Sequence, residues 1–150
     1  MEAPETHEAP KAPKAPKIKA KLNPVYALSS NTTVVNVKVD HLRKRKQYNN
    51  ISEWLSDNNN AYIGRQARIN VDGTYVGIKK SLWANDYTVK DHGREGALRL
   101  YKEKQIARLT QDPLWVSRLA ELKGKSLGCW CSPEPCHGDV LLELIAIYCP

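Results

Sequence analysis

The sequence contains no phenylalanine, a single methionine and no apolar run close to the roughly 20 residues that a membrane-spanning helix requires. Its N-terminus is charged and rich in proline, which is unlike a secretory leader. Both absences predict a protein of the cytoplasm or of a virion, neither secreted nor spanning a membrane. With 41% hydrophobic residues and a mean hydropathy of -0.55, the 150 residues cannot all belong to a core, so part of the chain is expected to be a tail.

Negative charge is also scarce, because 16 Asp and Glu residues oppose 23 Lys and Arg residues. The resulting net charge of +7 favours polyanionic partners, with nucleic acid first and anionic surfaces or acidic proteins after it. Three consecutive Ala-Pro-Lys triplets within residues 9–17 predict an extended, solvated arm. We therefore divide the chain into an N-terminal arm, residues 1–30, and a domain, residues 31–150. The arm is either a disordered solubilising tail or a segment that lies along nucleic acid or a partner protein.

Two basic segments are candidate contacts for nucleic acid or for a partner surface. One is the arm, and the other is a basic run inside a predicted insertion at about residues 41–60. The run is also compatible with a solvated loop. The candidate contact residues are Lys11, Lys14, Lys17, Lys19 and Lys21 in the arm, and Arg43, Lys44, Arg45 and Lys46 in the insertion.

The domain is predicted to be α/β, a single small layered fold with a partly parallel sheet flanked by helices. Residues 32–39 are β-branched and almost continuously apolar, which predicts a central strand covered on both faces. The insertion is expected to hold one short helix capped by Asn50 or Ser52. Residues 61–65 predict a second strand, and Asp72-Gly73 between alternating residues predicts a hairpin over 68–78.

The second half of the domain has helical periodicity. Residues 94–109 predict an amphipathic helix with Asp91 as a possible cap. Asp112-Pro113 predicts the start of another helix, which ends before Gly124. Residues 125–130 then predict a short strand, and the apolar residues 138–148 predict a buried C-terminal helix.

Three of the four cysteines lie in one loop with the spacing C-x-C-x₄-C-H. In a chain without a leader, such thiols indicate metal ligands or reactive groups before disulfides. Cys129, Cys131, Cys136 and His137 supply the four ligands that a structural zinc site needs, so zinc is possible. Adjacent Cys136 and His137 side chains would nevertheless point apart, and we predict no cofactor.

The position of this loop suggests a different use. Between a strand and the last helix, Cys136 would lie where backbone N–H groups and the helix dipole stabilise a thiolate or a bound phosphate. His137 and Asp139 would then be a proton carrier and a carboxylate, which makes Cys136, His137 and Asp139 the candidate catalytic residues. Alternatively, the cysteines and Trp130 fill the core, and His137 and Asp139 only begin the helix.

The run Leu122-x-Gly124-Lys125-x-Leu127-Gly128-Cys129-Trp130-Cys131-x-Pro133-x-x-Cys136-His137-Gly138-Asp139-Val140-Leu141 resembles the signature of the domain of unknown function 4326 family of bacteria, phages and large DNA viruses. The resemblance extends over about residues 33–148 and identifies a phage or large-DNA-virus type member. It implies a cleft formed by Arg65, Asn85, Arg94, Cys136 and His137, without implying an activity. Where the family usually has Asn-Pro followed by an aromatic residue, this chain has Asn85-Asp86-Tyr87.

Two function classes follow. The first is a domain that binds a nucleotide or nucleic acid, with or without a reaction. The second is a structural component of a virion or other large complex, whose arm binds neighbouring chains. Each arginine of the cleft is also compatible with an ordinary surface salt bridge. The residues predicted to bind an anion or nucleotide are Arg65, Asn85, Arg94, Cys136, His137 and Gly138.

Overall fold

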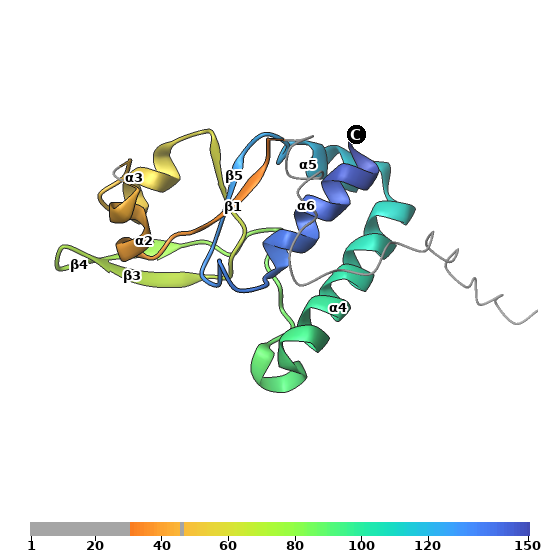
Figure 1. Ribbon diagram of the computed structural model, residues 1–150, viewed down its shortest axis with the longest axis horizontal. Coiled ribbons are helices and arrows are strands. Elements are labelled where there is room, and N and C mark those ends of the chain that lie inside the picture. Colours follow the sequence, from red (N-terminus) through yellow and green to blue (C-terminus); the bar gives the residue numbers. More distant parts are fainter. Residues whose placement is uncertain (1–30, 46) are drawn as a thin grey trace, which may run out of the picture.

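A three-stranded parallel sheet forms the centre of the computed structural model, which describes residues 31–45 and 47–150 (Figure 1). The predicted arm and Lys46 lie outside the described residues. The strands are β1 (Thr33–Asn36), β2 (Asn60–Tyr62) and β5 (Ser126–Cys129), in the order β1-β5-β2. The expectation that the first strand is central is therefore wrong. The apolar run in β1 arises because even this edge strand is covered on both faces, with Val34 and Val35 packing into two different clusters.

Two groups of elements cover the two faces of this sheet, as Figure 1 shows. One face packs against three helices: α4 (Val89–Gln111), α5 (Pro113–Ala120) and α6 (His137–Tyr148). The other face packs against α2 (Val39–Lys44), α3 (Ile51–Ser56) and the antiparallel hairpin of β3 (Ala67–Val71) and β4 (Thr74–Ile78). The predicted α/β class with a partly parallel sheet is thus confirmed. In the part of the chain described, no helix is long and apolar enough to cross a membrane.

The insertion is folded and supplies part of the core. The side chain of Asn50 accepts a hydrogen bond from the backbone N–H of Glu53 and so caps α3, as predicted. Trp54 is buried against Gly128 of β5. The sequence did not predict helix α2, because Leu42 is its one buried side chain and the basic residues around it have the pattern of a loop.

Local capping chemistry sets the boundaries in the second half. Asp112 caps α5 through Leu114 N–H, as predicted. The helix α4 begins earlier than expected, and its cap is Thr88, whose hydroxyl accepts a hydrogen bond from the backbone N–H of Asp91. Gly93, with φ 69° and ψ 165°, interrupts that helix, so its long regular part begins near Arg94.

Candidate functional site

A cleft of about 320 Å³ lies beyond the carboxyl ends of β2 and β5. Ligands of open α/β sheets bind at this edge, because loops that follow parallel strands converge there. The cleft is bounded by the loop after β2, the segment before α4, the first regular turns of α4 and the loop between β5 and α6. It brings together five of the predicted residues: Arg65, Asn85, Arg94, Cys136 and His137. Gly138 is not in its lining but packs against Val34 and Ile63.

Arg65 is held at the cleft by main-chain carbonyls. Its Nε donates to the carbonyl of Asn85 at 2.7 Å and its Nη2 to the carbonyl of Tyr87 at 3.5 Å. Asn85 is buried and closes the same segment, since its Oδ1 accepts from Tyr87 N–H and its Nδ2 donates to the Ala97 carbonyl. No ion pair to Arg65 occurs among the described residues. The guanidinium is therefore oriented without being neutralised.

Arg94 lines the cleft and also forms a surface salt bridge, the two roles that the sequence left open. Its Nη1 donates to the carbonyl of Pro135 at 2.8 Å, and its Nη2 forms an ion pair with Glu134 at 2.9 Å. Both side chains of that pair remain accessible to solvent, at 35% and 67% of their surface. Such exposed pairs contribute only about 0–1 kcal/mol, so a stronger anion in the cleft can replace Glu134 at low cost.

Two backbone N–H groups at the start of α6 already donate hydrogen bonds to side chains of the same turn. Cys136 is the N-cap, and its Sγ accepts from Gly138 N–H at 3.2 Å, while the Asp139 carboxylate accepts from Cys136 N–H at 3.0 Å. Burial raises the pKa of Asp139. Asp139, a catalytic candidate from the sequence, thus has a capping role and is not part of the cleft lining.

Cys129 and Cys136 form a buried thiol pair with their sulfur atoms 3.3 Å apart. The hydrogen bond from Cys136, with further donation from the N–H groups of Cys131 and Ser132, lowers the pKa of Cys129 to about 7. The pKa of Cys136 is raised, because its thiol is the donor in that bond and is itself buried. The lowered pKa thus falls on Cys129, and that of Cys136, where its position before α6 predicted a lowered value, is raised.

His137 is a neutral ring in the cleft wall. Its Nε2 donates to the carbonyl of Ile63 at 2.7 Å, and its ring packs edge-on against Tyr101. Burial lowers the pKa of His137, and the positive charge of Arg65 lowers it further. The proton on Nε2 leaves Nδ1 as the acceptor nitrogen of the ring.

The four residues of the alternative zinc site, Cys129, Cys131, Cys136 and His137, are not grouped as metal ligands in the described structure. Within residues 31–45 and 47–150, no three His, Cys, Asp or Glu side chains are grouped so that they could hold a metal ion. The Nε2 of His137 is bonded to the Ile63 carbonyl, and the sulfur atoms of Cys129 and Cys136 are bonded to each other. Zinc stays an untested alternative.

Sequence reasoning missed two aromatic residues in the cleft lining, Tyr87 and Trp130. The indole of Trp130 donates to the Tyr62 hydroxyl at 2.9 Å, and that hydroxyl donates to the Arg65 carbonyl at 2.7 Å, so the wall is braced by hydrogen bonds. Trp130 directly follows β5 and begins the cysteine loop. This position, at the carboxyl edge of the sheet, could have predicted that Trp130 lies in the cleft and not in the core.

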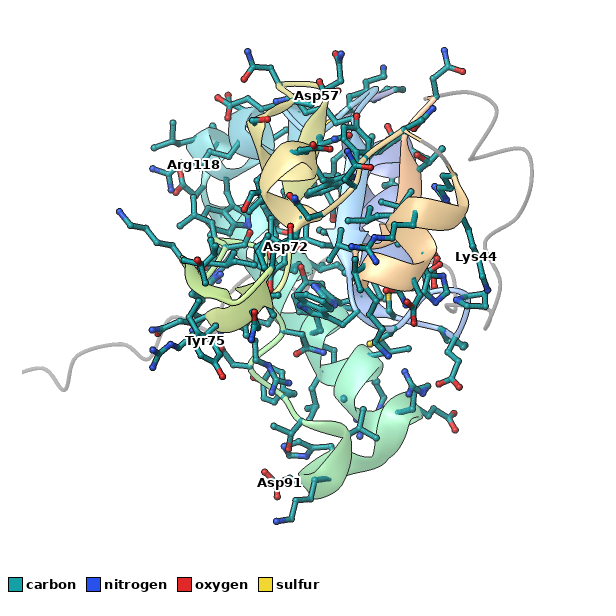
Figure 2. The ribbon with its side chains drawn as sticks, turned by 90° about the vertical axis from the view of Figure 1, so that its left-hand side faces the viewer. Lys44, Asp57, Asp72, Tyr75, Asp91 and Arg118 are labelled. Atoms are coloured by element: carbon teal, nitrogen blue, oxygen red, sulfur yellow. The ribbon has the colours of Figure 1, made fainter. Side chains whose placement is uncertain are left out.

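The described part of the basic run, Arg43–Arg45, does not line the cleft. Arg43 and Lys44 end α2, and the Arg43 Nε donates to the Asn49 carbonyl. Figure 2 shows Lys44 at the edge of the molecule opposite to Tyr75 and Arg118. The arm lysines and Lys46 lie outside the described residues.

These features define a small α/β domain with an arginine-lined cleft at the carboxyl edge of a parallel sheet. Residues 43–147 match the family described as Domain of unknown function (DUF4326), and the chain belongs to that family. The resemblance of the cysteine-loop signature is thereby confirmed.

Two relatives are viral proteins. The chain is 37% identical over 71 residues to an uncharacterized 12.4 kDa protein in the nrdA-td intergenic region of Enterobacteria phage T4, which covers 47% of this chain and 66% of that protein. It is 32% identical over 98 residues to the uncharacterized protein R718 of Acanthamoeba polyphaga mimivirus, covering 60% of this chain and 69% of that protein. The match thus spans slightly less than two thirds of the phage protein. No solved structure matches the chain.

Proposed function

We propose that this domain binds a nucleotide in the cleft, with the phosphate on Arg65 and Arg94 and the base against Trp130 and Tyr87. The observation that carries the proposal is the convergence of two guanidinium groups, from the loop after β2 and from α4, on one cleft with aromatic walls. Guanidinium groups match the planar geometry of phosphate oxygens, and aromatic faces stack on bases. A volume of about 320 Å³ lies at the small end of ligand pockets, which favours one nucleotide unit.

The electrostatics support an anionic ligand. Arg65 is fixed by carbonyl groups and keeps its full charge, and Arg94 has only an exposed carboxylate to exchange for a phosphate. His137 is neutral and can accept a hydrogen bond through Nδ1, for which the ribose hydroxyls or the exocyclic amino group of a base are suitable donors. The geometry supports these proposed binding roles and leaves a reaction unnamed.

The proposal is tested by calorimetric titration of the full chain with nucleoside mono-, di- and triphosphates and with inorganic phosphate. Arg94→Gln removes one charge-assisted hydrogen bond, worth about 1.5–3 kcal/mol, and should weaken nucleotide binding by about 10-fold or more. Arg99→Gln is the matched control, because Arg99 is an exposed arginine of the same helix that does not line the cleft. Arg65→Lys tests whether a point charge replaces the fixed guanidinium, and it should bind more weakly than the wild type. Absence of nucleotide binding by the wild type, or equal binding by Arg94→Gln and Arg99→Gln, would refute the proposal.

A further inference from the structure

Two more hollows follow the cleft across the surface. Gln66 and Ala67 line both the cleft and a second hollow of about 510 Å³ at the base of the β3–β4 hairpin. Lys80 lines both that second hollow and a groove of about 670 Å³ between the segment before α4 and the helices α4 and α5. Each hollow shares lining residues with the next, and we call these three neighbouring hollows, from the cleft to α5, the track.

The track is strongly basic. Its lining in the described part of the chain has eight cationic side chains and two carboxylates. Asp86 pairs with Lys80 at 2.6 Å and with Lys104 at 3.7 Å, and Asp112 is occupied as the cap of α5. The cationic residues are Arg65, Arg68, Lys79, Lys80, Arg94, Lys104, Arg108 and Arg118.

Three arginines of the track are ordered on aromatic rings. The guanidinium carbons of Arg108 and Arg118 lie 4.9 and 5.6 Å from the ring centre of Trp115, and that of Arg68 lies 4.6 Å from the ring centre of Tyr75. Nowhere in the described residues does one of these arginines have a carboxylate partner within ion-pair distance. Stacking restricts the side chains and leaves the donors at the guanidinium edge available for phosphate oxygens.

The arrangement of these arginines fits an extended ligand. Figure 2 shows Tyr75 and Arg118 at the same edge of the molecule. Trp115 is buried under its two arginines, whereas Tyr75 has 60% of its surface exposed and is available for stacking. Charges distributed along a track, with the exposed ring of Tyr75 against Arg68 at its side, match the phosphates and bases of a nucleic-acid strand.

We infer that the track binds single-stranded nucleic acid, with phosphates on Arg68, Arg108 and Arg118 and one nucleotide of the strand in the cleft. This inference rests on the proposed nucleotide site and specifies its substrate class as a polynucleotide. A single strand is favoured over a duplex because a nucleotide that enters the cleft must be unpaired and because the path is a chain of hollows.

The test measures fluorescence anisotropy of the full chain with labelled single strands of increasing length, at several salt concentrations. We expect affinity to increase with strand length until the track is filled. The double variant Arg108→Gln/Arg118→Gln should weaken binding of the long strand by about 10-fold or more. It should also reduce the log–log salt slope by about 1.4, because each neutralised phosphate of a single strand accounts for about 0.7 of the slope. Arg99→Gln should behave as the wild type.

Two additional measurements separate this inference from its alternatives. The variant Arg108→Lys/Arg118→Lys keeps both charges and should retain the salt slope, which controls for disturbed packing around Trp115. Thermal unfolding of each variant checks that the fold is intact. Affinity that does not depend on strand length, an unchanged slope in the Gln double variant, or tighter binding of a duplex would overturn the inference.

The outcomes also distinguish it from the proposed function. If mononucleotides bind through Arg94 and longer strands bind no more tightly, the track is wrong and the cleft assignment stands. If strands bind through Arg108 and Arg118 and mononucleotides neither bind nor compete, the cleft assignment is wrong.

Discussion

Replacing Gly128 by alanine should destabilise the domain substantially. Gly128 lies in the central strand β5, directly below the indole of Trp54. A Cβ atom at this position would lie 2.7 Å from Val37 Cγ1 and 2.8 Å from Trp54 Cζ2, and closer still to Trp54 Cη2. Carbon atoms are in favourable contact at about 3.5–4.0 Å, so the ring must move by about 1 Å or leave its site.

Whether the Trp54 ring shifts or leaves its site sets the range of the loss in the free energy of unfolding. Overpacking a well-filled core costs about 1–3 kcal/mol, and losing the packing of a buried tryptophan altogether costs about 3–5 kcal/mol. We therefore expect a loss of about 3 kcal/mol, because Trp54 is 2% exposed and has little room to shift. With a urea slope of about 1–3 kcal/mol/M, the unfolding midpoint should fall by at least about 1 M.

Urea unfolding followed by circular dichroism measures this effect. Gly77→Ala is the matched control, since no heavy atom lies within 4 Å of its added Cβ. The cost of Gly128→Ala should fall in a Trp54→Leu background, where the clash with the indole is removed and only the close contact with Val37 remains. If Gly128→Ala moves the midpoint no more than Gly77→Ala does, the insertion does not pack on β5 and the reasoning is refuted.

Three further predictions concern buried charge and capping. The pKa of Cys129 is about 7 in the folded protein and 9.0 in the unfolded chain, so the unfolded state keeps the proton to higher pH. The free energy of unfolding should therefore rise by about 2 kcal/mol between pH 7 and 9, and this contribution should be lost as pH falls through 7. Urea midpoints under reducing conditions measure this rise, which Cys129→Ser should abolish. Lys102→Met removes the buried partner of Glu143 at 3.2 Å and should cost about 3–5 kcal/mol by thermal unfolding, whereas Lys102→Met/Glu143→Leu should recover most of the loss. Asn50→Ala should cost about 1 kcal/mol and Asn50→Asp much less, and equal losses in urea would contradict the cap.

Sequence patterns predicted those elements whose determinants are local. Asp112 and Pro113 specify the start of α5 through one side-chain acceptor and one fixed φ angle. The Asp72-Gly73 turn is readable for the same reason, because both residues adopt positive φ, at 51° and 88°, as the tight hairpin requires. The mostly apolar composition of 138–148 suffices to predict that most of α6 is buried, from Val140 to Ile145.

Features that are decided by a choice between competing partners could not be predicted from the sequence. The edge position of β1 is decided by the pairing of both β1 and β2 with β5, which no pattern within β1 records. Which of the two thiols has the lowered pKa is likewise decided by hydrogen bonds. Cys129 accepts one from Cys136 and others from the N–H groups of Cys131 and Ser132, which lower its pKa. The choice of Thr88 over Asp91 as the cap of α4 reflects a competition between two acceptors of similar propensity.

The segment before α4 joins the two proposed sites. Side chains alternate along it, so that Asn85 and Tyr87 line the cleft while Ala84 and Asp86 line the groove. The Asp86 carboxylate forms ion pairs with Lys80 and Lys104. These pairs compensate two of the lysine charges of the groove, so a strand bound there should make its phosphate contacts mainly with Arg108 and Arg118, which have no carboxylate partner among the described residues.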